Sequence, residues 1–69
     1  MCHAVPGKII STNGLTARVS FNGAIKNVNL IFCPRAKEGD YVSVHVGIAQ
    51  AVINEDEANE VLALLTQAS

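Results

Sequence analysis

Two closely spaced Asn-Gly pairs restrict the fold of this 69-residue chain more than any other feature. Asn13-Gly14 and Asn22-Gly23 both match the two-residue turn of a β-hairpin, whose central residues need a positive φ. Between them, Thr16–Phe21 alternates apolar and polar residues, as expected of a strand with one buried face. The chain therefore predicts an antiparallel meander with Lys8–Ser11, Thr16–Phe21 and Ile25–Phe32 as its strands.

The same alternation assigns side chains to the core and continues into a second pair of strands. In the meander, the residues expected to face the core are Ala17, Val19, Phe21, Val28, Leu30 and Phe32. Pro34 to Gly39 is polar and charged and predicts an exposed loop. Tyr41–Val46 then predicts a fourth strand with Val42, Val44 and Val46 on one face and His45 on the other. Gly47 breaks or bulges this run, and Ile48–Ile53 resumes as a fifth strand.

The C-terminal segment changes to a helical period. Asn54 is a favourable N-cap, and Glu57 three residues later completes a capping-box pattern. The apolar stripe of the helix comprises Ala58, Val61, Leu62 and Leu65, and Leu64 widens it. Because a short helix persists only when docked, we expect it to cover an open end or face of the sheet.

Five short strands and one helix predict a mainly β domain, a small OB-like five-stranded β-barrel with a C-terminal α-helix. A short open sandwich is the alternative. The whole chain, residues 1–69, forms a single domain, with the barrel over about 1–53 and the helix over about 55–66. A chain this small has no room for an enclosed active site, so a site must lie on the surface or be completed by a partner.

Charge and hydropathy disfavour two classes of partner. The net charge is −1, and the basic residues are dispersed along the chain at Lys8, Arg18, Lys26, Arg35 and Lys37. A nucleic-acid surface needs clustered cations and stacking aromatics, so a single-stranded nucleic-acid binder is only a third hypothesis. No run is long enough to cross a bilayer, and no secretory signal is visible. The sequence therefore predicts a cytoplasmic protein without nucleic-acid or membrane partners.

Cys2 is the first candidate for chemistry. Removal of Met1 would leave its thiol beside a free α-amine, and a thiolate is both a nucleophile and a soft-metal ligand. The alternative is a frayed chain end that happens to contain a cysteine. The second cysteine, Cys33, follows an apolar run and precedes Pro34, so we interpret it as a small buried hydrophobe, with a ligand role as the weaker alternative.

His45 is the second candidate. It lies on the strand face opposite the valines, and Gly47 nearby allows close approach of another element. If the N-terminal segment packs there, Cys2 and His45 form a two-donor site suited to iron, zinc or copper, with positions left for exogenous ligands. A structural or solvated histidine is the alternative. His3 is a poorer partner for Cys2, because neighbouring side chains on an extended segment point in opposite directions.

Several enzyme signatures are absent from the sequence. It contains no Cys-x-x-Cys pair, no glycine-rich phosphate loop and no nucleophile elbow. Four of the six acidic residues gather where the helix begins, and capping and solvation account for them there: Glu55, Asp56, Glu57 and Glu60. The sequence therefore does not predict an enzyme.

With these residues in view, the chain resembles the HypC/HupF family of hydrogenase maturation chaperones over nearly its whole length. The resemblance is carried by three segments: Met1-Cys2-x-Ala4-Val5-Pro6-Gly7-Lys8-Ile9, Gly39-Asp40-Tyr41-Val42-Ser43-Val44-His45-Val46-Gly47-Ile48-Ala49, and Ile53-Asn54-Glu55-Asp56-Glu57-Ala58. It implies an OB-like barrel with a C-terminal helix. The chain departs from the family at position 3, which is usually aliphatic and is His3 here.

The resemblance also implies a function. Family members bind the iron–sulfur scaffold protein HypD, help build an iron centre with carbon monoxide and cyanide ligands, and associate with the [NiFe] hydrogenase large-subunit precursor. By this resemblance Cys2 is the iron ligand and partner anchor, and His45 is a second ligand. Pro6 and Gly7 would shape the N-terminal tip that, with Cys2 and His3, meets partners. The iron is carried transiently, with no permanent cofactor. An OB-type interaction module without metal carriage is the alternative.

Overall fold

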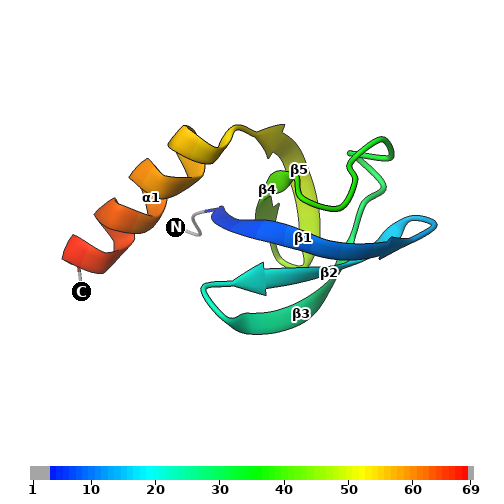
Figure 1. Ribbon diagram of the computed structural model, residues 1–69, viewed down its shortest axis with the longest axis horizontal. Helices are drawn as coiled ribbons and strands as arrows, with labels where there is room; N and C mark the ends of the chain where they lie inside the picture. Colours follow the sequence, from blue (N-terminus) through cyan, green and yellow to red (C-terminus); the bar gives the residue numbers. More distant parts are fainter. Residues whose placement is uncertain (1–3, 69) are drawn as a thin grey trace.

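The computed structural model describes residues 4–68, with side chains up to Leu64, and contains five strands and one helix (Figure 1). The elements are β1 (Val5–Asn13), β2 (Thr16–Phe21), β3 (Ala24–Asn29), β4 (Tyr41–His45), β5 (Ile48–Ile53) and α1 (Glu55–Ala68). Within the described residues, no helix has the length and apolarity needed to span a membrane.

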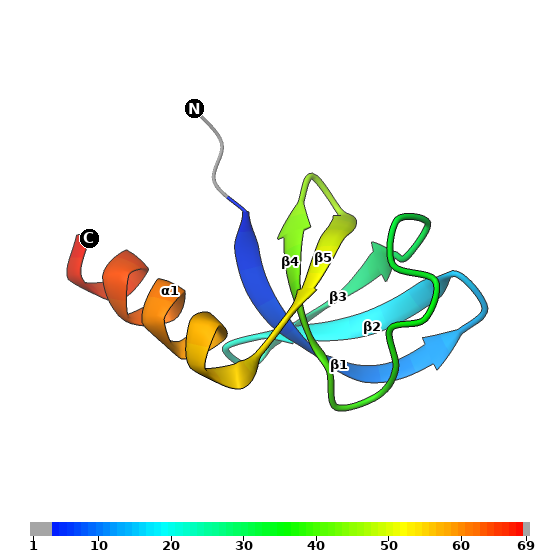
Figure 2. The same cartoon turned by 90° about the horizontal axis from the view of Figure 1, so that it is seen from above.

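The strands close into a barrel in the order β1-β2-β3-β5-β4, with β4 pairing back onto β1 (Figure 2). All neighbours are antiparallel except β3 and β5, which run parallel and pair at Asn29 and Ile48. This closure confirms the predicted OB-like barrel with a C-terminal helix and rules out the open sandwich.

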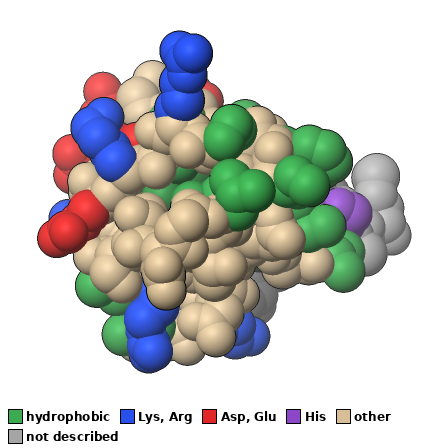
Figure 3. Space-filling model, turned by 90° about the vertical axis from the view of Figure 1, so that its right-hand side faces the viewer, with side chains coloured by type: hydrophobic (Ala, Val, Ile, Leu, Met, Phe, Trp, Pro, Cys, Tyr) green, Lys and Arg blue, Asp and Glu red, His purple; other side chains and the backbone are tan. Residues whose placement is uncertain are grey.

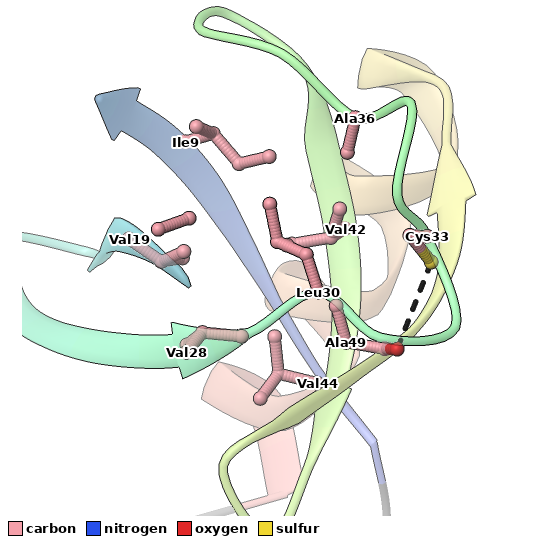
Figure 4. Packing of buried hydrophobic residues seen from close by; sticks show 10 residues of the cluster. Ile9, Val19, Val28, Leu30, Cys33, Ala36, Val42, Val44 and Ala49 are labelled. Carbon is pink, nitrogen blue, oxygen red and sulfur yellow. Dashed lines mark hydrogen bonds between the residues drawn. The ribbon is translucent and has the colours of Figure 1, made fainter. Parts of the chain in front are cut away.

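The core fills the inside of the barrel with alternate residues of each strand (Figure 4). Its largest fully buried side chains are Ile9, Val19, Val28, Leu30 and Val42. Because a strand turns successive side chains to opposite faces, the predicted alternation placed most of these residues correctly. Phe21 lies half-buried against the same cluster.

The end of the third strand differs from the prediction. β3 stops at Asn29, whose side-chain Oδ1 accepts a hydrogen bond from the Ile31 amide at 2.7 Å. The Cys33 amide then donates to the Leu30 carbonyl at 2.9 Å, so the chain turns instead of continuing the ladder. Phe32 is 65% exposed, and its predicted core position is wrong. Here a local side-chain bond to the backbone outcompetes the strand pattern.

The first strand is longer than predicted, and its turn is shifted by one residue. β1 begins at Val5 and runs to Asn13, which pairs with Thr16. The turn therefore consists of Gly14 and Leu15, with a positive φ of 63° at Gly14 alone. Glycine at the first central position is typical of a type II′ hairpin turn.

The Asn22-Gly23 turn is confirmed, since the φ angles of its two residues are 57° and 102°. Both central residues therefore adopt the left-handed conformation that a type I′ turn requires.

The predicted helix is confirmed, together with its N-cap. Asn54 Oδ1 accepts the Glu57 amide at 2.7 Å, and Asn54 Nδ2 donates to Glu57 Oε1 at 3.0 Å. Helix α1 contacts β1 and β4, with Ala58 fully buried and Leu62 half-buried, and then extends to the side of the barrel (Figures 1 and 2). The helix therefore docks on β1 and β4, as expected of a short helix, while its C-terminal part extends away from the barrel. Leu64 is 64% exposed, and the side chain of Leu65 lies outside the described residues.

Candidate functional site

The N-terminal end of β1 brings the chain that follows Cys2 against the end of β4. Val5 pairs with Val44, and Val44 precedes His45. Cys2 and His3 themselves lie outside the described residues. Three peptide bonds join Cys2 to Val5, so their Cα atoms lie within about 11 Å of each other. The predicted pairing of Cys2 with His45 remains a prediction.

His45 lies on the outer face of β4, as the alternation predicted. Val42 and Val44 are buried in the core, and His45 is half-buried on the opposite side. The space-filling view shows its side chain beside a group of hydrophobic side chains (Figure 3).

The Nε2 atom of His45 is fully buried and has no hydrogen-bond partner within residues 4–68. A buried polar atom without a partner costs on the order of 1–3 kcal/mol, so such atoms usually have one. A neutral imidazole nitrogen is a common metal ligand and a good hydrogen-bond acceptor. His45 therefore has the chemistry and the free atom that a ligand role needs.

The residues after His45 form an unusual turn. Val46 and Gly47 connect β4 to β5 with φ angles of 54° and 77°, as in a type I′ turn. Val46 was predicted to be a strand residue of the core, but it is 79% exposed. A β-branched residue in the left-handed region is an outlier with a cost on the order of 1–3 kcal/mol. The pattern of alternating valines could not reveal this turn, because the apolar period continues through it.

A shallow groove opens between this turn and the start of β1. Its volume is about 280 Å³, and its lining includes Val5, Phe21, Val28, Val44 and Val46. Lys26 is the charged side chain among the lining residues. Sequence reasoning missed this groove, because closure of the barrel assembles it from four separate strands and the turn between β4 and β5.

Pro6 and Gly7 lie inside β1, paired with Ser43 and Val42, and not in a tip before the strand. Both are buried. A Cβ atom on Gly7 would overlap with the Val19 side chain and would lie 2.8 Å from Cε1 of Phe21. Gly7 therefore permits close packing of β1 on β2, a role that a glycine inside an apolar strand can signal. Their predicted role in partner binding stays a prediction.

Cys33 is a buried core residue, as interpreted from the sequence. It is 8% exposed, and its thiol donates to the Ala49 carbonyl at a Sγ–O distance of 3.6 Å (Figure 4). Within residues 4–68, no three His, Cys, Asp or Glu side chains gather closely enough to hold a metal ion. In the described part of the chain, His45 is a candidate donor. The predicted second donor, Cys2, lies outside the described residues.

Comparison with known proteins places these residues in a wider context. The model of the HupF/HypC family matches residues 1–65. The hydrogenase maturation factor HypC of Synechocystis sp. is 44% identical over 68 residues, covering 90% of each chain. HypC of Escherichia coli (strain K12) is 40% identical over 68 residues, covering 90% of this chain and 76% of the relative. The hydrogenase maturation factor HybG of the same strain is 36% identical over 74 residues, and the match covers 97% of this chain and 90% of the relative.

Proposed function

The chain belongs to the HupF/HypC family of hydrogenase maturation factors, and on this premise we propose that it carries iron between the proteins that assemble a [NiFe] hydrogenase. The family resemblance stated above is thereby confirmed. Members of this family are maturation chaperones, not catalysts. The proposed cargo is an iron atom with cyanide and carbon monoxide ligands, held transiently.

In this proposal the Cys2 thiolate binds the iron and His45 supplies a second donor through Nε2. A site with only two protein ligands leaves coordination positions for cyanide and carbon monoxide. It also allows release, because few protein bonds must break when the cargo moves on. The single observation that carries the proposal is the buried, unpaired Nε2 of His45 beside the strand that leads back to Cys2.

The proposed partners are the HypD-type iron–sulfur scaffold and the precursor of the hydrogenase large subunit, both meeting the protein in the cytoplasm. The related HypC and HybG proteins are named as hydrogenase maturation factors, which supports a role among other maturation proteins. Cys2 would anchor both associations in turn, while the barrel presents the surface around it. His3 would lie in the same contact.

The test is an anaerobic pull-down with the wild type, Cys2→Ala and Cys33→Ala, reporting bound proteins and iron together. Cys33→Ala is the matched control, because it removes a thiol that is buried and bonded to Ala49. We expect Cys2→Ala to fold and to lose both iron and partners, whereas Cys33→Ala keeps them. Unchanged partners and iron with Cys2→Ala would refute the proposal.

The alternative function is an OB-type interaction module in which Cys2 serves only as a contact. The apolar, exposed Val46 and its groove favour some protein contact at this end of the barrel. This alternative predicts that partners co-purify with the wild type while its iron content stays at the level of Cys2→Ala.

A further inference from the structure

Val46 holds an unfavourable conformation without a compensating contribution to the core. Its φ is 54°, and its side chain is 79% exposed. Asparagine or glycine would adopt the same positive φ at a lower cost in conformational free energy. Asn22 does so in the β2–β3 turn, with a φ of 57°. Residues whose type conflicts with their backbone conformation, and which add no stability to the fold, are often functional. We therefore expect the Val46 side chain to contact another molecule.

The groove that Val46 borders has a volume of about 280 Å³ and a lining in which valines and Phe21 predominate, so it can accept an apolar side chain. Val5 and Val44, which pair with each other between β1 and β4, both line the groove. The groove therefore lies at the start of β1, three residues after Cys2 in the sequence. A protein that engages Cys2 would meet this groove in the same contact.

Lys26 gives this apolar groove a positive charge. The residues that line it include no carboxylate, and Lys26 has no ion-pair partner among the described residues. Lys26 is exposed, and a carboxylate on the occupant would complement its charge.

We propose that the groove between Val5, Val46 and Lys26 is a docking site for the HypD-type scaffold, the first of the two partners proposed to engage Cys2. Its occupant is an apolar side chain flanked by a carboxylate. This inference rests on the proposed function and deepens it, because it assigns the second contact of the same association. Val46 then acts as a docking residue whose strained turn is retained for binding and not for stability.

The test compares the wild type with Val46→Asn and with the control Leu15→Asn, using the purified HypD-type scaffold as the probe. Leu15 is 48% exposed, lies in the β1–β2 turn and does not line the groove. For Val46→Asn we expect binding at least about tenfold weaker, because an apolar side chain buried at the contact is lost. We also expect a melting temperature about 4–8 °C higher, because the turn strain is relieved. Leu15→Asn should leave the affinity unchanged.

A second pair of variants tests the charge. Lys26→Met should weaken binding severalfold and flatten its dependence on salt, whereas Arg35→Met, outside the groove, should do neither. Equal affinities for the wild type, Val46→Asn and Lys26→Met would overturn the docking site. So would a concentration-dependent dimer of the wild type that Val46→Asn abolishes, because the occupant would then be a second copy.

Including Cys2→Ala separates this inference from the proposed function. If Cys2→Ala abolishes binding while Val46→Asn does not weaken it, the groove is refuted and the proposed function stands. If Cys2→Ala binds as the wild type does while Val46→Asn is weakened, the groove stands as a contact and the anchoring role of Cys2 is refuted.

Discussion

At the scale of single residues, His45 combines a solvent-side position on β4 with a ring nitrogen that is buried and unpaired within residues 4–68. A histidine kept only for stability would be expected to bond through both nitrogens or to face water, because unpaired burial is unfavourable. The arrangement therefore favours a binding role, and it makes His45 removable without harm to the barrel.

His45→Leu tests this reading. Replacing the imidazole by an apolar side chain removes an unpaired buried nitrogen, so we expect the free energy of unfolding to change by less than about 1 kcal/mol or to increase. Iron retained after anaerobic purification should fall severalfold, while partner capture through Cys2 persists. Urea unfolding and iron analysis measure the two effects. A stability loss above about 2 kcal/mol with unchanged iron would instead assign His45 a structural role.

Gly7 provides the opposite case, a residue needed for packing. In Gly7→Ala the new Cβ would overlap with Val19 and crowd Phe21, both parts of the core region. We expect a loss of about 1–3 kcal/mol in the free energy of unfolding, because overpacking forces the strands apart. Thr12→Ala, an exposed change in the same strand, is the control and should stay within about 0.5 kcal/mol. Equal stability of Gly7→Ala and the wild type would contradict the packing role.

At the scale of elements, the residues that were predicted correctly act through local chemistry. Asn22-Gly23 forms its turn because both residues tolerate a positive φ, and Asn54 caps α1 through its own side chain. Val42 and Val44 face the core because strand geometry alternates faces.

Two residues were wrongly predicted to lie in the core, because contacts made by neighbouring residues end the strand before each of them. Phe32 leaves the core because Asn29 bonds to the following backbone, and Val46 leaves it because β4 and β5 pair around a two-residue turn. Apolar alternation continues through both positions, so the pattern alone could not mark the strand ends.

Asn54→Ala tests the contribution of the helix cap. It removes the acceptor for the Glu57 amide, so we expect a loss of about 1 kcal/mol in stability and a lower helix content. Asn59→Ala, a change at an exposed helix residue, should not lower either quantity. Circular dichroism with thermal melting measures both variants. A helix signal unchanged in Asn54→Ala would show that docking on β1 and β4 alone maintains α1.

At the scale of the whole molecule, the predicted site could be located only in part. The five strands, the C-terminal helix and the outward position of His45 follow from turns and alternation, and the structure confirms them together with the predicted barrel. The pairing of β4 with β1 that closes the barrel is seen only in the structure. The groove of Val5, Val46 and Lys26 could not be predicted, because its residues meet only when separate strands close into a barrel.

The charge of the molecule gives a further prediction. With a net charge of −1 and five dispersed basic residues, we expect no salt-dependent binding to single-stranded DNA or RNA in a gel-shift titration at low ionic strength. Binding that weakens steeply with added salt would revive the nucleic-acid hypothesis.

The most direct test of the central claim is the infrared spectrum of anaerobically purified protein from cells that make hydrogenase, recorded for the wild type and Cys2→Ala. The account predicts cyanide and carbonyl stretching bands together with iron in the wild type, and neither in Cys2→Ala. Bands of equal strength in both proteins, or iron-free wild type that still supports hydrogenase maturation, would contradict it.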